Sequence, residues 1–311
     1  MSWASAGSSS NPPVPGKATS LAGLALRQVR RLLLVLLLGG LLGATLVRLS
    51  PGFGVDEREL DPRLSVESRQ AIHAERASEN NIFLFYPRYL SGLARGDFGF
   101  SRSLNRPVSQ LLAERLPVTL ESLSYGVLGG VCLGLGLAVI SLFWRIPGAG
   151  LVSSLASGLC LAVPAAVIAL LFLWVGAAGR WAIALVVFPH VYRYTKNVLA
   201  ETYQSPHVPA AQARGLSESR ILCAHVLAPA APQLAAVIGI SVSLAFGASL
   251  PIEVICDTPG VGQLAWRAAL DRDLPLLVTI TMLVAVLTMV ANSLADLALA
   301  AWEPSKRASS V

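Results

Sequence analysis

No charged side chain occurs between residues 148 and 179, and residues 123–144, 226–252 and 274–302 are almost as apolar, with Asp296 as their single charge. A bilayer core about 30 Å thick is crossed by about 20 helical residues, so each stretch is long enough to cross it. A β-barrel would instead alternate apolar and polar residues in segments of about ten. The chain is only 14% charged, against roughly 25% in ordinary soluble domains. These features exclude a soluble enzyme and predict an all-α integral membrane protein.

The apolar segments predict about six transmembrane helices, with the N- and C-termini cytoplasmic. The first follows three arginines, a pattern that a secretory signal peptide would share. The fourth, at residues 181–191, is short and can span only if its helix continues through Tyr192 and Tyr194. With six spans, eleven Lys and Arg lie inside and three in the short outside loops, as the positive-inside rule requires. This bias accounts for the net charge of +6 without nucleic-acid binding.

The chain divides by composition into a membrane core and flanking segments. Residues 50–115 hold nine acids and nine arginines, with helices expected at 65–77 and 82–93. The expected segments are a flexible cytoplasmic tail (1–31), a first transmembrane helix (32–49), an extracytoplasmic segment (50–115), a membrane core with five transmembrane helices (116–302) containing a cytoplasmic loop (193–228), and a cytoplasmic C-terminal tail (303–311).

Motifs of known catalytic sites are missing from the sequence. There is no GxxxxGK[ST], HExxH, GxSxG or CxxC, and the four histidines are scattered. The four cysteines read as small hydrophobic residues, neither a disulfide framework nor a metal site. A membrane-embedded enzyme would need paired catalytic groups at membrane depth, and Asp296 is the only acid well inside a span. We therefore expect no catalytic residues and no metal.

A polar segment at residues 192–232 is the most informative part of the chain. Its small residues precede Gly215, which suits a left-handed helix end, and Ser217 is a fair N-cap for a second short helix at 218–225. The result would be a helix–turn–helix elbow on the cytoplasmic side. The residues alone leave two interpretations open, a docking surface for another protein and an ordinary connector.

Four motifs in the correct order resemble the permease subunits of ABC transporters, specifically the dipeptide, oligopeptide and nickel importer family. The segment HVPAAQARGL at 207–216, followed by HVL at 225–227 and Pro232, resembles the EAA loop of that family. The segments at 86–121 and 252–277 resemble its Gly-Asp and Pro-Gly-x-Gly regions, and the polar residues of the last span match its Asn and Asp. The resemblance covers residues 20–305 and implies a type I ABC importer transmembrane domain.

The resemblance implies three groups of functional residues. The ATPase-coupling loop would consist of Ala210, Ala211, Ala213, Arg214, Gly215 and Leu216. An outer gate or a docking surface for a binding protein would consist of Glu253, Asp257, Pro259, Gly260, Gly262, Arg272 and Asp273. Without the resemblance, the charges of this segment indicate a solvated loop. Asn292 and Asp296 are intramembrane polar residues, and we expect Asp296 to make a structural hydrogen bond to a neighbouring helix rather than to bind solute.

The resemblance also implies the assembly and its location. The partners would be a second homologous permease, two P-loop ATPases, an extracytoplasmic solute-binding protein and membrane lipid, with no nucleic acid. The chain would hold no cofactor, because ATP and Mg would bind to the ATPases. It would lie in the bacterial inner membrane as a multi-pass protein. Family breadth favours di- and oligopeptides as solutes; nickel, another small solute and a non-transporting scaffold are the alternatives.

Several departures from the family pattern bear on these expectations. His207, Pro209 and Gln212 are atypical of the coupling loop, and Cys256 with Asp257 replaces an apolar and aromatic pattern. The outer loop between the third and fourth spans is reduced to residues 177–180. This shortening leaves the substrate class open, since that face would meet the incoming solute.

Overall fold

The structure is a computed structural model that describes residues 21–49, 87, 89–93, 95–143 and 149–308. Most of the N-terminal tail, the helix expected at 65–77 and the last three residues lie outside the described residues. Residues 89–93 are helical, within the helix expected at 82–93.

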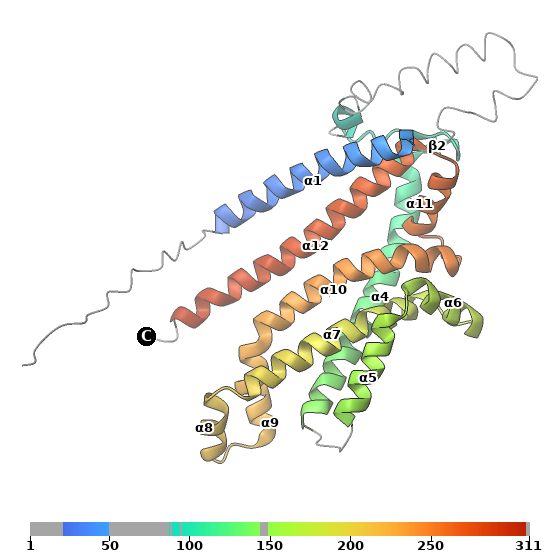
Figure 1. Ribbon diagram of the computed structural model, residues 1–311. Coiled ribbons are helices and arrows are strands. Elements are labelled where there is room, and N and C mark those ends of the chain that lie inside the picture. The colour runs from blue at the N-terminus through green and yellow to red at the C-terminus, as the bar shows by residue number, and fades with distance from the viewer. Residues whose placement is uncertain (1–20, 50–86, 88, 94, 144–148, 309–311) are drawn as a thin grey trace, which may run out of the picture.

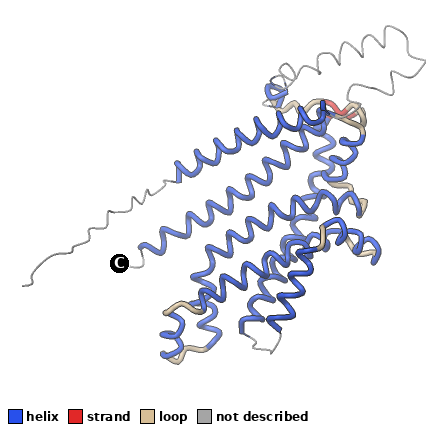
Figure 2. The backbone as a smooth tube through the Cα atoms, in the orientation of Figure 1, coloured by secondary structure: helices blue, strands red, loops and turns tan. Residues whose placement is uncertain are grey.

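The described residues form long helices joined by short turns, together with one small hairpin (Figures 1 and 2). The hairpin pairs β1 (Phe100–Ser101) with β2 (Arg106–Pro107) in antiparallel register. The helices are α1 (Leu21–Leu49), α4 (Val108–Phe143), α5 (Ala149–Ala162), α6 (Ala165–Val175), α7 (Gly179–Tyr203), α8 (His207–Ala213), α9 (Glu218–Arg220), the π-helix η2 (Ile221–Leu227), α10 (Ala228–Ile255), α11 (Val261–Leu270) and α12 (Leu274–Ala308). The all-α prediction is confirmed.

Three helices in the described part of the chain are long and apolar enough to cross a membrane: Val108–Leu142, Glu218–Ile255 and Leu274–Asp296. A fourth span is counted if α5 and α6 act together. The count of six therefore stays a prediction that depends on α1 and α7. Helix α7 has 25 residues, or about 37 Å at 1.5 Å per residue. It continues past residue 191 to Tyr203, as the fourth span required.

The uncharged segment at 148–179 is broken at Pro164, where α5 and α6 meet at 100°. Proline has no backbone N–H and disfavours helix in the residue before it, so α5 ends at Ala162 and α6 starts anew. With 14 and 11 residues, the two helices are about 21 and 16 Å long, and neither crosses a bilayer alone. Gly176, with φ of 72°, ends α6, and two further residues lead into α7.

Close packing of α4 against α7 forms the centre of the core. Three glycines four residues apart, Gly126, Gly130 and Gly134, line one face of α4. A Cβ on Gly130 would lie 2.8 Å from the Cβ of Val187, and one on Gly134 would lie 2.7 Å from that of Val191. Small residues at this spacing let two helix backbones approach closely, which is how membrane helices gain dispersion energy.

Helices α10, α12 and α1 extend from this core in that order (Figure 1). Helix α12 packs on α10, and α1 packs on the far side of α12. The exposed surface of α1 is largely apolar: Leu26, Val29, Leu33, Leu34, Val35, Leu37, Leu38 and Leu41. Such a face suits lipid or a neighbouring subunit.

Candidate functional site

The polar segment between α7 and α10 folds into a compact elbow, defined here as residues 207–220. Helix α8 is fixed by Val208 and Ala211, which are buried against side chains of α7, η2 and α10. The opposite face of α8 is open, and its residues are Pro209, Ala210, Gln212 and Ala213, followed by Arg214 and Gly215. The predicted coupling residues thus divide. Ala211 and the half-buried Leu216 hold the elbow in place, while Ala210, Ala213, Arg214 and Gly215 face outward.

Gly215 adopts the left-handed conformation that its position predicted, with φ of 71°. Its N–H donates to the carbonyl of Gln212 over 2.9 Å, and the next N–H, of Leu216, donates to that of Ala211 over 3.4 Å. A Cβ at Gly215 would meet no atom within 4 Å. The glycine is therefore required by backbone conformation and not by crowding within this chain.

The second helix of the elbow differs from the prediction in two ways. Ser217 precedes the helix in an extended conformation, but its side chain makes no capping bond and lies 3.4 Å from the hydroxyl of Ser219. The helix also does not stop at residue 225. It runs through the π-helix η2 into α10, giving one helix from Glu218 to Ile255. The apolar run that begins at Ile221 packs against α8 and α7, which favours continuation over a stop.

His207 and His225, scattered in the sequence, meet at the elbow. Their ring centroids are 6.3 Å apart, and His207 Nε2 donates to the backbone carbonyl of His225 over 2.8 Å. Pro229, four residues after His225, has no N–H to offer that carbonyl. The His207 ring supplies a side-chain donor to that carbonyl. Two features of the sequence could have indicated this contact: Pro229, four residues after His225, and the atypical His207.

Replacing His207 with alanine is expected to loosen the elbow while leaving the rest of the fold intact. The change removes one donor from a backbone carbonyl, which is worth about 1 kcal/mol. Hydrogen exchange of residues 207–227 should quicken several-fold relative to wild type. Gln212→Ala is the control, since its amide bonds only the hydroxyl of Tyr203, over 3.2 Å. Equal exchange in the two variants would contradict this role.

At the other end of α10, Glu253 is buried, with 1% of its surface exposed. Its Oε2 accepts from the N–H of Gly262 over 2.6 Å, while Oε1 has no partner among the described residues. The interpretation of this residue as part of a solvated loop is therefore wrong, because the Pro-Gly-x-Gly turn folds back over the carboxylate. We name the contact of Glu253, Gly260, Val261, Gly262 and Thr119 the outer joint.

The glycines of the outer joint are required by close approach. A Cβ on Gly260 would overlap the Glu253 carboxylate, and one on Gly262 would lie 2.8 Å from the Cα of Leu250. Between them, the N–H of Val261 donates to Thr119 Oγ1 over 2.8 Å, which ties α11 to α4. Thr119 lies in the segment at 86–121 that resembles the family, but the sequence indicated no role for it, because its partner lies 142 residues away.

Asp273 is also buried, so the solvated interpretation is wrong here too. It precedes α12 and binds the hairpin segment through Oδ2, which accepts from the hydroxyl of Ser101 over 2.7 Å and from the N–H and hydroxyl of Ser103 over 3.0 and 2.9 Å. Its Oδ1 accepts from the N–H of Leu276 over 3.3 Å, as in a helix N-cap. Asp273 therefore joins the hairpin segment to the last helix, and neither serine was identified from the sequence.

The remaining outer residues are exposed. Asp257 and Arg272 adopt positive φ of 49° and 53° in the turns that flank α11, and Pro259 lies beside the first turn. Asp257 Oδ1 accepts from the Gln263 amide over 2.5 Å. Cys256, which departs from the family pattern, lies with its Sγ 3.7 Å from the carbonyl of Ala169, and burial raises the pKa of its thiol. The residues predicted to form an outer gate or docking surface thus divide into a buried set, which includes the outer joint, and an exposed set.

The two polar residues of the last span contact different helices. Asn292 Oδ1 accepts from the Ser243 hydroxyl of α10 over 2.7 Å, and Asp296 Oδ2 accepts from the Gln28 amide of α1 over 2.8 Å. The expected hydrogen bond of Asp296 to a neighbouring helix is confirmed. Within the described ranges, no group of three or more His, Cys, Asp or Glu could hold a metal ion, so we assign no metal site there.

Comparisons with known proteins agree on one family. The family model described as "Binding-protein-dependent transport system inner membrane component" matches residues 130–308. A putative peptide transport system permease protein of Brucella abortus is 27% identical over 92% of this chain and 99% of its own length. The oligopeptide transport system permease protein AppB of Bacillus subtilis is 24% identical over 79% of this chain and 87% of its own.

A solved structure shows the same fold. A chain of the inward-facing MetNI methionine ABC transporter superposes with a TM-score of 0.56 at 19% identity, covering 62% of this chain and 96% of that one. The helical architecture, the elbow and the match to the family model all indicate the same family. The chain belongs to the family of binding-protein-dependent transport system inner membrane components, and it is a multi-pass permease subunit of an ABC importer in the bacterial inner membrane.

Proposed function

We propose that this permease forms one half of the solute pathway of a peptide importer and that its elbow docks on an ATPase subunit. The single observation that carries the docking role is the open face of small side chains on α8, held rigidly from behind by Val208 and Ala211. Small exposed residues let a partner approach the backbone closely. Relatives named as peptide and oligopeptide permeases support the choice of solute.

Helix α10 connects the elbow to the outer joint. The continuous helix from Glu218 to Ile255 has 38 residues, about 57 Å at 1.5 Å per residue. Its inner end carries the elbow, and its outer end carries Glu253 with α11 attached. A displacement of the elbow would therefore be transmitted along one continuous helix to the outer end of the pathway.

The rest of the assembly follows from this role. A second homologous permease would complete the pathway, and two P-loop ATPases would bind ATP and Mg, so this chain would itself be neither an enzyme nor a cofactor-binding protein. The exposed turn residues Asp257, Pro259 and Arg272 would meet an extracytoplasmic solute-binding protein. The buried Glu253 and Asp273 would fix the conformation of the turns that carry these exposed residues.

The test is retention of the ATPase subunits by the intact complex, purified in mild detergent. Ala210→Asp and Ala213→Asp place a charge on the open face of α8, and we expect about tenfold less co-purified ATPase and a similar loss of peptide uptake in proteoliposomes. Ala269→Asp, the same change at an exposed site on α11, is the control and should retain the ATPases. Full retention by both α8 variants would refute the docking role.

Two variants test whether Gly215 is required for its left-handed backbone conformation or for the close approach of a partner. Gly215→Val places a β-branched residue at positive φ, so we expect it to uncouple ATP hydrolysis from uptake. Gly215→Asn tolerates the left-handed conformation and should couple better than the valine variant. Equal coupling of ATP hydrolysis to uptake in the two variants would contradict a conformational requirement at Gly215.

Uptake of a metal or another small solute in place of peptides would overturn only the choice of solute.

A further inference from the structure

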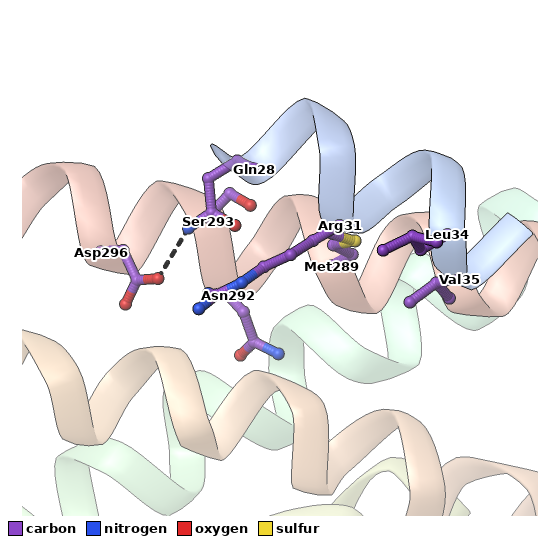
Figure 3. A pocket seen from close by; sticks show the side chains of 8 residues that line it. All are labelled: Gln28, Arg31, Leu34, Val35, Met289, Asn292, Ser293 and Asp296. Atoms are coloured by element: carbon purple, nitrogen blue, oxygen red, sulfur yellow. Dashed lines mark hydrogen bonds between the residues drawn. The ribbon is translucent and has the colours of Figure 1, made fainter. Parts of the chain in front are cut away.

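A cavity of about 390 Å³, open to the surface, lies between α1 and α12, away from both the elbow and the outer joint (Figure 3). Its lining combines charged, amide and apolar side chains: Gln28, Arg31, Leu34, Val35, Met289, Asn292, Ser293 and Asp296. The two helices contribute four residues each. Neither the coupling role nor the solute pathway proposed above makes use of this cavity.

The lining changes from polar to apolar along the two helices. In α1 the apolar run begins directly after Arg31, and Gln28, one turn before Arg31, lies level with Asp296 of α12. The two helices are antiparallel here, because Gln28 bonds Asp296 while Val35, later in α1, lines the cavity with Met289, earlier in α12. Both polar ends therefore lie at the same membrane boundary, and Leu34, Val35 and Met289 lie deeper. A polar end at headgroup level and an apolar end in the hydrocarbon region match the two parts of a phospholipid.

The polar end carries one cation and one anion. Figure 3 shows the Arg31 side chain extending from α1 toward Asn292 on α12. Among the residues that the structure describes, Arg31 has no hydrogen-bond or ion-pair partner. Asp296 uses Oδ2 for the Gln28 amide. The cavity thus contains a guanidinium that is unpaired in the described part of the chain, that of Arg31, and a carboxylate that accepts hydrogen bonds, that of Asp296.

We propose that this cavity binds phosphatidylethanolamine from the adjoining leaflet. The phosphate pairs with the Arg31 guanidinium, which suits phosphate by charge and by its fork of donors. The headgroup ammonium donates to the Asp296 carboxylate, and an acyl chain lies on Leu34, Val35 and Met289. Basic cavities between membrane helices are established lipid sites in general.

The carboxylate selects among lipids. Phosphatidylglycerol offers the phosphate but no cation, so it leaves Asp296 facing an anion at close range. Phosphatidylcholine offers a cation without an N–H donor for the carboxylate. A bound lipid would fix α1 to the end of α12 at the membrane boundary. The inference rests on the membrane location of the chain and not on the docking role of the elbow, so either can fail without the other.

The first test measures lipid retained by the intact transporter, exchanged into mixed phosphatidylethanolamine, phosphatidylglycerol and phosphatidylcholine and analysed by native mass spectrometry. We expect phosphatidylethanolamine to dominate in the wild type and to fall about tenfold in Arg31→Gln. Arg30→Gln is the matched control, since Arg30 is an exposed neighbour outside the lining. Equal retention by Arg31→Gln and Arg30→Gln would overturn the proposal.

Asp296→Asn tests the selectivity separately. The amide oxygen still accepts from Gln28, so the helix contact is kept while the negative charge is lost. We expect the preference for phosphatidylethanolamine over phosphatidylglycerol to disappear, with total phospholipid retained. An unchanged preference would show that the carboxylate does not read the headgroup.

A photo-crosslinking benzoylphenylalanine at position 35 distinguishes lipid from a protein occupant. Irradiation of the complex in native membranes is expected to add the mass of one phospholipid to this chain. An adduct with another polypeptide would show that a partner subunit covers the cavity, and the lipid proposal would then fall.

Discussion

Gly130→Leu is expected to prevent α4 from packing on α7 and to leave little folded protein. A Cβ at this position would lie 2.8 Å from the Cβ of Val187 and 2.9 Å from the backbone carbonyl of Ala184. Because a backbone atom is involved, no rotamer change relieves the overlap, and the two helices must separate along the centre of the core. We expect a destabilisation at the upper end of the range for overpacking, about 3 kcal/mol or more.

Gly136→Leu is the matched control for this prediction. Gly136 lies on the same helix, and a Cβ there would meet nothing within 4 Å. The measurement is the yield of monodisperse complex in mild detergent, followed by unfolding in increasing SDS. Gly130→Leu should be lost from the monodisperse peak, whereas Gly136→Leu should behave as the wild type. Similar unfolding curves for the two variants would contradict the proposed contact between α4 and α7.

Asp273→Ala is expected to detach the hairpin segment from the last helix. The change leaves the buried hydroxyl of Ser101 and the N–H of Ser103 without their acceptor and removes the N-cap of α12. Leaving the buried Ser101 hydroxyl unpaired costs about 1–3 kcal/mol, and with the lost N-cap we expect a loss of about 3 kcal/mol in all. Hydrogen exchange should rise most in residues 100–107 and in the first turn of α12.

Asp271→Ala, two residues earlier and exposed, is the control for the loss of a carboxylate in this turn. It should leave both the stability and the exchange pattern close to the wild type, because exposed charges contribute little. Asp273→Asn keeps one acceptor oxygen and should fall between the two. Equal protection of residues 100–107 in all three variants would disprove the anchoring role of Asp273.

Local features of the chain were predictable because they depend on few residues. The apolar stretches indicated helices of membrane-spanning length, and Gly215 indicated a left-handed turn, which the structure has. Pro164 was visible in the sequence as a break, but the angle of 100° between α5 and α6 was not. A proline interrupts a helix by itself, whereas the direction in which the chain resumes depends on what α6 packs against.

Residues brought together from distant segments were not predictable. Composition placed Glu253 and Asp273 in a charged outer loop, yet both are buried, because Gly262 and Ser101 come to lie against them. Similarly, Ala210 and Ala211 are adjacent and alike in the sequence, and only the packing of α8 on η2 turns one outward and the other inward.

The membrane class, the helical fold and the position of the elbow turn follow from the linear order of residues, because hydropathy over about 20 positions and the φ of a glycine are local properties. The division of the site into anchoring and exposed residues arises only in three dimensions. Ser101 and Asp273 are 172 positions apart in the chain. No pattern within either segment specifies the other as its partner, so their hydrogen bond exists only once the helices have assembled.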